Sequence, residues 1–384
     1  MDFKKLLANR HNYAKAWKAK TGHKVVAWFD PYFPEEIAYA AGLLPVRILA
    51  EHAPDSNSDK WIYSSCYPMR DMVNLFLRGD YGYVDGLVNV ECCQWMYNAF
   101  EVAANNFPEK FNHYFFMPDY TDAPTSKHAT RSEMNTLKKR FEEWTGNVVT
   151  DEALDEAIAV FNENRLLLRQ IYQMRRQERP MVSGSEMMHA LLADQVMDKA
   201  EMNLLLKEFI RELEDREPGK DRIRLMLIGS ETWDARLEEL VEQLGAVVVA
   251  DDLDNGSSYI WNNVIPDKDR LMALALRYLG RPHSAIKDNN WRRRPQRIFE
   301  MAEDYGVDGA LIAKQVYCHC HGTDAYMVWK QLRERSIPFH YFERVNFLQE
   351  EETLSRLESF LAMLKPGLNH LYGWHKTFDE EAAI

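Results

Sequence analysis

The sequence predicts an α/β protein with two parallel-sheet domains and a helical insert between them. One observation is a strand, helix and strand traced over residues 24–48 and repeated over residues 222–252. Another is a local repeat, because an Asp-Gly turn precedes a short apolar run both at Asp85-Gly86 and at Asp308-Gly309. Short apolar runs suit parallel strands that helices cover on both faces. The chain is therefore expected to begin the same fold twice.

The first unit starts at Lys24 with a short apolar strand, and Asp30-Pro31, a dipeptide that favours a turn, follows it. A helix is expected from about Pro34, because proline is tolerated in a first helical turn. Gly42 would end this helix, and a second strand follows it. The order predicts a β-α-β unit.

The middle of the chain, from about residue 129 to 217, is predicted to be helical. Five apolar residues recur there at helical spacing: Leu154, Ile158, Phe161, Leu168 and Tyr172. Ser183-Gly-Ser-Glu186 matches a capping box and predicts the start of another helix. Glu217-Pro-Gly219 marks a boundary. The expected domains are residues 1–128, 129–218 and 219–384.

The repeated unit is predicted to have strands over residues 223–228 and 246–250, with an amphipathic helix over residues 235–244 between them. A final helix is expected from Thr353 to Leu364, where Pro366-Gly367 would end it. In open parallel sheets, ligands gather outside the carboxyl ends of the strands. Two such edges that face each other would enclose a cleft.

Composition excludes several classes of protein. The 384-residue chain is 46% hydrophobic and carries a formal net charge of −12, which argues against binding a phosphate backbone. No apolar run approaches the roughly 18 residues that a membrane span needs. The N-terminal residues lack the apolar core and cleavage site of a secretion signal. We expect a cytoplasmic protein without nucleic-acid or membrane partners.

The five cysteines are the main candidates for chemistry. Cys318-His-Cys-His321 is a poor zinc motif, because adjacent side chains diverge and zinc ligands usually come in spaced pairs. Cys92-Cys93 and Cys318 follow predicted buried strands in the two halves, and Cys66 follows the first β-α-β unit. Three thiolates of this kind suit an iron–sulfur cluster. The alternative is that all five cysteines are small buried hydrophobic residues.

Several segments together resemble the 2-hydroxyacyl-CoA dehydratase and benzoyl-CoA reductase family, over nearly the whole chain. They are Pro34-Glu-Glu-Ile-Ala-Tyr-Ala-Ala-Gly-Leu-Leu-Pro-Val46, Ser65-Cys66, Val84-Asp-Gly86 leading to Cys93, and Cys318 followed by Asp324 and Ser336-Ile-Pro338. The resemblance implies two Rossmann-like domains of flavodoxin-like type, a helical element, and a related partner subunit. It also implies one 4Fe-4S cluster in each subunit, held by three cysteines.

By this resemblance the cluster ligands are Cys66, Cys93 and Cys318. Cys92 stands one position too early after Gly86 to match the family spacing, and Cys320 stays an alternative ligand. The family usually continues Cys-Asp-Pro at the third cysteine, whereas this chain has Cys318-His-Cys320. This departure makes His319 and His321 candidate proton donors that other members of the family lack.

Two reactions of the family compete. A reductase delivers electrons and protons to the aromatic ring of benzoyl-CoA, and a dehydratase passes one electron to a 2-hydroxyacyl-CoA and recovers it. In both, the resemblance implies that a separate iron–sulfur activator hydrolyses ATP, and this chain has no nucleotide-binding motif. The matching segments around residues 144–165 favour the smaller cluster-bearing subunit of the ATP-dependent reductase. A subunit that only relays electrons, or a scaffold, is the non-catalytic alternative.

Side chains near the predicted strand ends are candidates for the substrate site. The aromatic candidates for the walls of a ring pocket are Trp95, Tyr97, Trp233 and Tyr317, which are equally suited to a core or an interface. The candidate proton donors are His319, His321 and the carboxylates Glu91 and Glu231. Arg292, Arg293 and Arg294 could bind the phosphates of CoA, in a basic cluster with Arg281 and His283, or could form a solvated helix start.

Overall fold

The computed structural model describes residues 1–51, 57–220, 222–287, 293–344 and 350–365. Within them it has two four-stranded sheets, and every strand pair is parallel. The N-terminal sheet has the order β2-β1-β3-β4 and the C-terminal sheet the order β6-β5-β7-β8, so the two sheets have the same topology. The predicted α/β class with two Rossmann-like units is confirmed.

The N-terminal unit forms from the first third of the chain. Its strands are β1 (Val25–Trp28), β2 (Leu44–Arg47), β3 (Gly86–Val90) and β4 (Phe111–Phe115). Its helices are α1 (Phe3–Ala8), α2 (Arg10–Thr21), α3 (Glu35–Ala40), α4 (Asp59–Ile62), α5 (Tyr67–Arg78) and α6 (Gln94–Asn106). All residues of β1, β2 and β3 are buried, as expected for parallel strands covered on both faces.

The C-terminal unit repeats this plan. Its strands are β5 (Arg224–Ile228), β6 (Val247–Asp252), β7 (Gly309–Gln315) and β8 (Phe339–Arg344). Its helices are α11 (Arg236–Gln243), α12 (Arg270–Leu279), α13 (Arg294–Asp304), α14 (His319–Glu334) and α15 (Glu350–Leu364). The last helix begins three residues before the predicted Thr353, and the predicted stop at Pro366-Gly367 lies outside the described residues.

The repeated Asp-Gly turns have the same structural role in both units. Asp85 Oδ2 accepts a hydrogen bond from the amide of Val25 at 2.9 Å, and Asp308 Oδ2 accepts one from the amide of Arg224 at 2.8 Å. Each aspartate therefore fastens the start of the neighbouring strand. The following glycine pairs in register with the central strand of its sheet in each case. The sequence repeat reflects a structural repeat.

Four helices connect the two units: α7 (Ser126–Thr145), α8 (Asp151–Met174), α9 (Gly184–Asp194) and α10 (Lys199–Glu214). The predicted apolar face of α8 is buried, and Ser183 forms the predicted capping box with Glu186. Helix α3 of the N-terminal unit and α12 of the C-terminal unit both pack on α7 and α8. The exact domain boundaries near residues 128 and 218 stay predictions.

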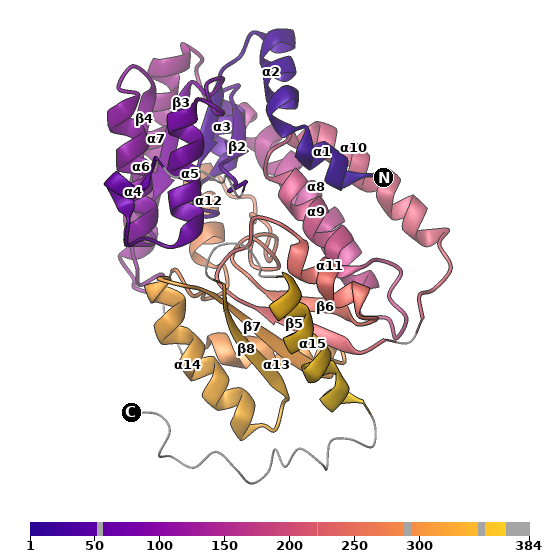
Figure 1. Cartoon of the computed structure of the whole chain (residues 1–384). Coiled ribbons are helices and arrows are strands. Elements are labelled where there is room, and N and C mark those ends of the chain that lie inside the picture. Colours follow the sequence, from indigo (N-terminus) through magenta and orange to yellow (C-terminus); the bar gives the residue numbers. More distant parts are fainter. Residues whose placement is uncertain (52–56, 221, 288–292, 345–349, 366–384) are drawn as a thin grey trace.

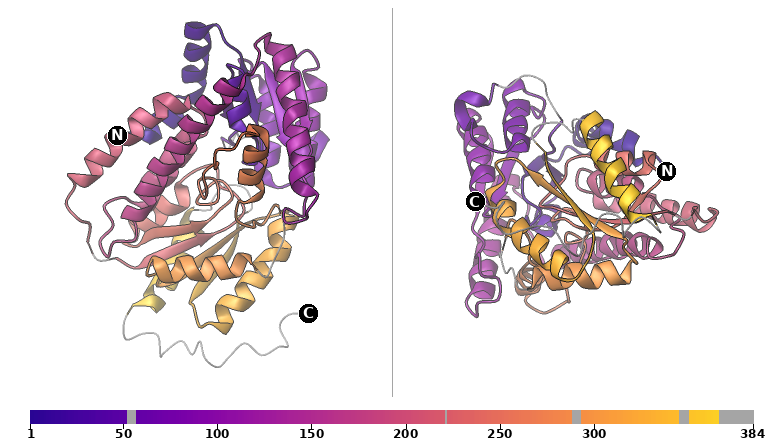
Figure 2. Two further views of the ribbon diagram at one scale, coloured as in Figure 1. Left: turned by 180° about the vertical axis from the view of Figure 1, so that it is seen from behind. Right: turned by 60° about the horizontal axis from the view of Figure 1, so that its bottom comes forward.

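The two sheets lie one above the other, with the long helices α8 to α10 along one side (Figure 1). The view from behind shows the same helices extending from the N-terminal unit to the C-terminal sheet (Figure 2). Side-chain contacts described below join the carboxyl ends of the two sheets. Among the described helices, none is long and apolar enough to cross a membrane.

Candidate functional site around three cysteines

Cys66, Cys93 and Cys318 each lie at the N-cap position of a helix, α5, α6 and α14 respectively. Cys93 and Cys318 also follow β3 and β7, the strands beside the central strand of each sheet. None of them forms a disulfide. The N-terminus of a helix carries partial positive charge, so three such ends favour thiolates or another anionic group.

The fold brings these three thiols close enough to influence one another electrostatically. Burial, together with the charges of Cys318 and Cys93, raises the pKa of the Cys66 thiol well above its usual value. Burial raises the pKa of Cys318 to about 11, the amide of His321 lowers it, and Cys93 raises it. Residues far apart in the sequence therefore converge on one place.

The three thiols can be compared with the ligand set of an iron–sulfur cluster. Among the described residues, no group of three or more His, Cys, Asp or Glu side chains is arranged so that it could hold a metal ion. In an iron–sulfur cluster each thiolate binds a different iron atom, so the ligand sulfurs stand farther apart than the ligands of one ion. Three uncrosslinked cysteines at one site, each at a helix N-terminus, have the chemistry that such a cluster needs.

The two alternative ligands lie beside this group. A hydrogen bond from Cys92 lowers the pKa of Cys93, and burial raises the pKa of Cys92 itself. Cys92 also contacts Asp30 and lies 3.4 Å from the sulfur of Met96. Burial raises the pKa of Cys320 to about 12, with Cys93 and Cys318 acting in the same direction. Cys92 and Cys320 both stay alternative ligands, and Cys92 also donates a hydrogen bond to Cys93.

Glu231 follows β5 and is almost completely buried. Its Oε2 lies 2.9 Å from Nη2 of Arg47, which ends β2 in the other sheet and is fully buried. Burial raises the pKa of Glu231 to about 7, although the charge of Arg47 opposes the shift. This ion pair joins the carboxyl ends of the two sheets.

The two histidines after Cys318 have different surroundings. The ring of His319 is exposed and stands edge-to-face with Trp95, with centroids 6.1 Å apart. His321 is fully buried, and neither ring nitrogen makes a hydrogen bond with the described residues. Burial and the charge of Arg294 lower the pKa of His321 well below its usual value, so its imidazole is neutral at pH 7.

The aromatic candidates differ in their exposure to solvent. Trp233 is buried, Trp95 is half-buried, and Tyr317 is exposed with a left-handed φ of 64° just before Cys318. Such a backbone conformation is strained for an aromatic residue and is common beside functional sites. Tyr97 packs edge-to-face on Tyr114. These two tyrosines line a cavity of about 390 Å³ together with Glu91, Cys92 and Cys93.

The arginines of the predicted basic cluster have different surroundings. Arg292 lies outside the described residues. Arg294 is buried, and its Nε lies 2.7 Å from Asp252 Oδ2. Its Nη1 forms an ion pair with Asp324, and its Nη2 donates a hydrogen bond to the carbonyl of Gly229. Arg293 is exposed and pairs with Asp122. Of the two described arginines, only Arg293 presents its guanidinium at the surface.

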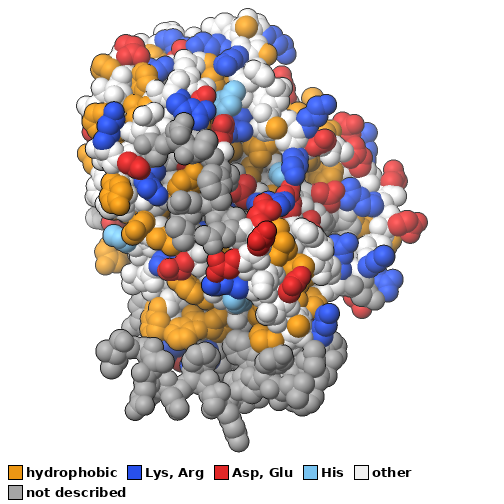
Figure 3. Space-filling view, in the orientation of Figure 1, with side chains coloured by type: hydrophobic (Ala, Val, Ile, Leu, Met, Phe, Trp, Pro, Cys, Tyr) orange, Lys and Arg blue, Asp and Glu red, His pale blue; other side chains and the backbone are white. Residues whose placement is uncertain are grey.

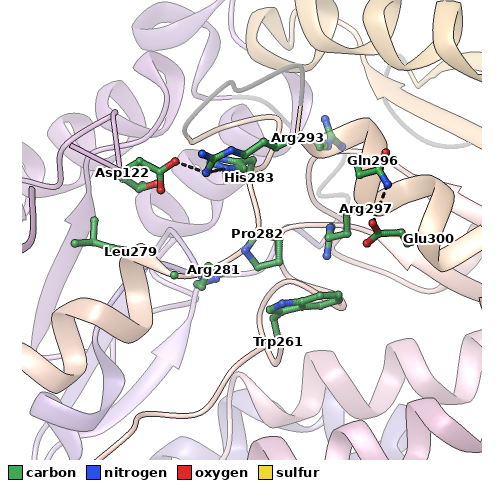
Figure 4. Close-up of a pocket in the computed structure, with 13 residues that line it drawn as sticks. Asp122, Trp261, Leu279, Arg281, Pro282, His283, Arg293, Gln296, Arg297 and Glu300 are labelled. Carbon is green, nitrogen blue, oxygen red and sulfur yellow. Dashed lines mark hydrogen bonds and ion pairs between the residues drawn. The ribbon is translucent and has the colours of Figure 1, made fainter. Parts of the chain in front are cut away.

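Arg293 lines a second cavity, of about 320 Å³ (Figure 4). Its wall includes both predicted basic segments, since Arg281 and His283 lie in it as well. Trp261 faces this cavity with 43% of its surface exposed, and the guanidinium of Arg297 lies 5.0 Å from its ring centre. Elsewhere on the visible surface, acidic and basic side chains are interspersed (Figure 3).

Sequence reasoning missed Arg47 and Lys287. Lys287 is buried, and its Nζ donates hydrogen bonds to the carbonyls of Glu91 at 2.7 Å and Met117 at 2.6 Å. It therefore joins the C-terminal half to the ends of β3 and β4. No periodicity marks a single charged residue whose partners lie far away in sequence. The position of Arg47 at the end of a predicted strand was the one available signal.

Comparison with known proteins found related sequences along most of the chain. The family model of the 2-hydroxyglutaryl-CoA dehydratase, D-component, matches residues 31–364. A benzoyl-CoA reductase subunit of Thauera aromatica is 27% identical over 343 residues, which cover 86% of this chain and 88% of that protein. The (R)-phenyllactyl-CoA dehydratase beta subunit of Clostridium sporogenes is 23% identical over 347 residues, which cover 88% of this chain and 90% of that protein.

Proposed function

The chain belongs to the 2-hydroxyglutaryl-CoA dehydratase, D-component, family, and on that basis we propose that it is the iron–sulfur subunit of an enzyme that acts on an acyl-CoA thioester. The observation that carries this proposal is the convergence of Cys66, Cys93 and Cys318 at three helix N-termini. These cysteines would hold one 4Fe-4S cluster, which supplies one-electron transfer at low potential when it is bound.

The protein's own residues would position and protect this site. The surrounding structure shields the thiol of Cys66, which is only 8% exposed, whereas Cys93 and Cys318 are partly exposed. His319 is our preferred proton donor, because it is exposed next to Cys318 whereas the ring of His321 is enclosed. Imidazole can transfer a proton near neutral pH. Glu231 is the second candidate.

Between the two reactions, we propose reduction of an aromatic acyl-CoA ring to a cyclic dienoyl-CoA. The similarity to the benzoyl-CoA reductase subunit of Thauera aromatica supports this choice. The alternative is dehydration of a 2-hydroxyacyl-CoA, which the similarity to dehydratase beta subunits supports. A related cluster-bearing subunit and a separate ATP-hydrolysing activator would complete either enzyme.

A substrate comparison tests this choice. The chain, its partner subunit, the activator and ATP should reduce benzoyl-CoA and leave 2-hydroxyacyl-CoA thioesters unchanged, as measured by chromatography of the products. Formation of an enoyl-CoA from the hydroxy substrate alone would establish the dehydratase. A cluster that becomes reduced but whose EPR signal does not respond to either thioester would establish an electron-relay subunit.

We further propose that Arg293 binds a phosphate of the CoA moiety at the cavity in Figure 4. Arg293→Ala should raise KM for acyl-CoA about fivefold with kcat unchanged, because an exposed charged contact contributes about 1 kcal/mol. Steady-state kinetics would measure this effect. S-acyl-pantetheine, which lacks the phosphates, should show no change. Arg131→Ala removes another surface arginine, paired with Asp269, and serves as the control; an equal effect of both variants would exclude a specific phosphate contact.

A further inference from the structure

Trp261 is an exposed aromatic residue on a fixed segment of the chain. It has 43% of its surface exposed and lines the cavity of about 320 Å³ in Figure 4. The carbonyl of the preceding residue, Ile260, accepts a hydrogen bond from Arg169 Nη1 at 2.6 Å. Nδ2 of the following residue, Asn262, donates one to the carbonyl of Arg277 at 3.0 Å. The chain is therefore held on both sides of a large ring that stays in contact with solvent.

Two buried arginines form part of the cavity wall beside this ring. The guanidinium of Arg297 lies 5.0 Å from the ring centre of Trp261, and its Nη2 donates to Ser258 Oγ at 3.0 Å. Arg281 donates through Nη2 to the carbonyl of Asp254 at 2.6 Å and through Nε to the carbonyl of Ser258 at 3.2 Å. Both guanidinium groups are thus fixed before any ligand arrives, and a preformed wall costs a ligand little ordering.

An exposed cation lies on the other side of the cavity. Figure 4 shows Arg293 and Trp261 on opposite sides, and the side chain of Arg293 is 59% exposed although it pairs with Asp122. An aromatic ring binds a nucleobase by stacking, and a guanidinium binds phosphate. The two together are typical of a site for a phosphorylated nucleoside. This cavity shares no lining residue with the cavity beside Cys93, so the two are distinct.

We propose that the cavity in Figure 4 binds the 3′-phosphoadenosine end of CoA, with the adenine stacked on Trp261 and the 3′-phosphate at Arg293. This inference rests on the acyl-CoA function proposed above and names the part of the substrate that the cavity recognises. The thioester is at the opposite end of CoA from the adenosine, which agrees with a second, distinct cavity beside Cys93. The residues around Trp261 would contribute to substrate binding and not to the chemistry at the thioester.

Isothermal titration calorimetry of the full-length chain with adenosine 3′,5′-bisphosphate tests this inference. This ligand has the base and the phosphates but no thioester, so the measurement needs neither a cluster nor turnover. Trp261→Ala should weaken binding about tenfold, as expected for the loss of one stacked base. Trp261→Phe keeps an aromatic ring and should retain most of the affinity. Equal losses in the two variants, with unchanged urea midpoints, would show that no base stacks here.

Trp61→Ala is the matched control. Trp61 lies on α4, is 50% exposed and does not line this cavity. Its substitution should leave the affinity unchanged, and a loss equal to that of Trp261→Ala would exclude a specific stacking contact. The inference is also wrong if the wild-type chain does not bind adenosine 3′,5′-bisphosphate, or if Trp261→Ala binds it as tightly as the wild type.

A second measurement needs no variant and so applies even if Trp261→Ala does not fold. Photolysis of the wild-type chain with 8-azidoadenosine 3′,5′-bisphosphate should label the peptide that contains Trp261, as identified by mass spectrometry. Labelling confined to other segments would overturn the inference. Iron content and thioester turnover test the proposed function separately. A chain with iron and turnover that binds no adenosine ligand overturns only the inference, whereas a chain that binds the ligand but holds no iron overturns only the proposed function.

Discussion

Cys66→Ser, Cys93→Ser and Cys318→Ser are each expected to lose the cluster and, with it, all electron-dependent activity. Serine keeps the size of the side chain but offers a hard oxygen where iron–sulfur chemistry needs a thiolate. The measurement is iron and acid-labile sulfide per chain after anaerobic purification. Retention of wild-type iron in all three variants would mean that these cysteines hold no cluster.

Cys92→Ser and Cys320→Ser are the matched controls for this series. Both cysteines lie beside the proposed ligands, and Cys92 donates a hydrogen bond to Cys93. These variants should keep their iron, with at most an altered EPR spectrum. If Cys92→Ser loses iron while Cys93→Ser retains it, the ligand assignment moves to Cys92. The same comparison decides between Cys318 and Cys320.

Lys199→Met should destabilise the protein strongly. Lys199 is 1% exposed, and its Nζ donates hydrogen bonds to the carbonyl and carboxylate of Asp194 and to Tyr259 Oη. It also lies 3.6 Å from the buried Glu35. Removal of the cation leaves buried carboxylates unpaired, which costs about 3–5 kcal/mol. A large decrease in the urea midpoint is expected.

Lys207→Met provides a control on the same helix. Lys207 pairs with Glu163 at 2.7 Å, but both side chains are more than 40% exposed. Surface ion pairs of this kind contribute about 0–1 kcal/mol, so the urea midpoint should hardly move. Equal shifts of the urea midpoint in the two variants would show that the buried ion pairs of Lys199 contribute no more to stability than a surface pair.

The sequence predicted the elements well where local physics determines them. The capping box at Ser183, the apolar face of α8 and the two β-α-β units depend on residues within a few turns or strands of each other. Strand β5 begins at Arg224 against a predicted start at residue 223, because hydrophobic runs locate strands to within a residue or two. The local Asp-Gly repeat also correctly indicated a repeated topology.

The surroundings of the cysteines could not be predicted in the same way. The pairing of Arg47 with Glu231, and the hydrogen bonds of Lys287 to carbonyls just after β3 and β4, depend on how the two units dock. The burial of Arg294 in two ion pairs could not be predicted from the sequence either, because three consecutive arginines suggest an exposed basic surface. Charges in long-range contacts leave no periodic pattern in a sequence.

The placement of the three proposed ligands also bears on how the protein matures. Cys66 and Cys93 precede Cys318 by more than 200 residues, so they leave the ribosome before it. A nascent N-terminal unit would therefore offer two thiolates, and the third becomes available once the C-terminal sheet has folded against it. If the cysteines hold the proposed cluster, its insertion would then be complete only in chains whose two units have docked.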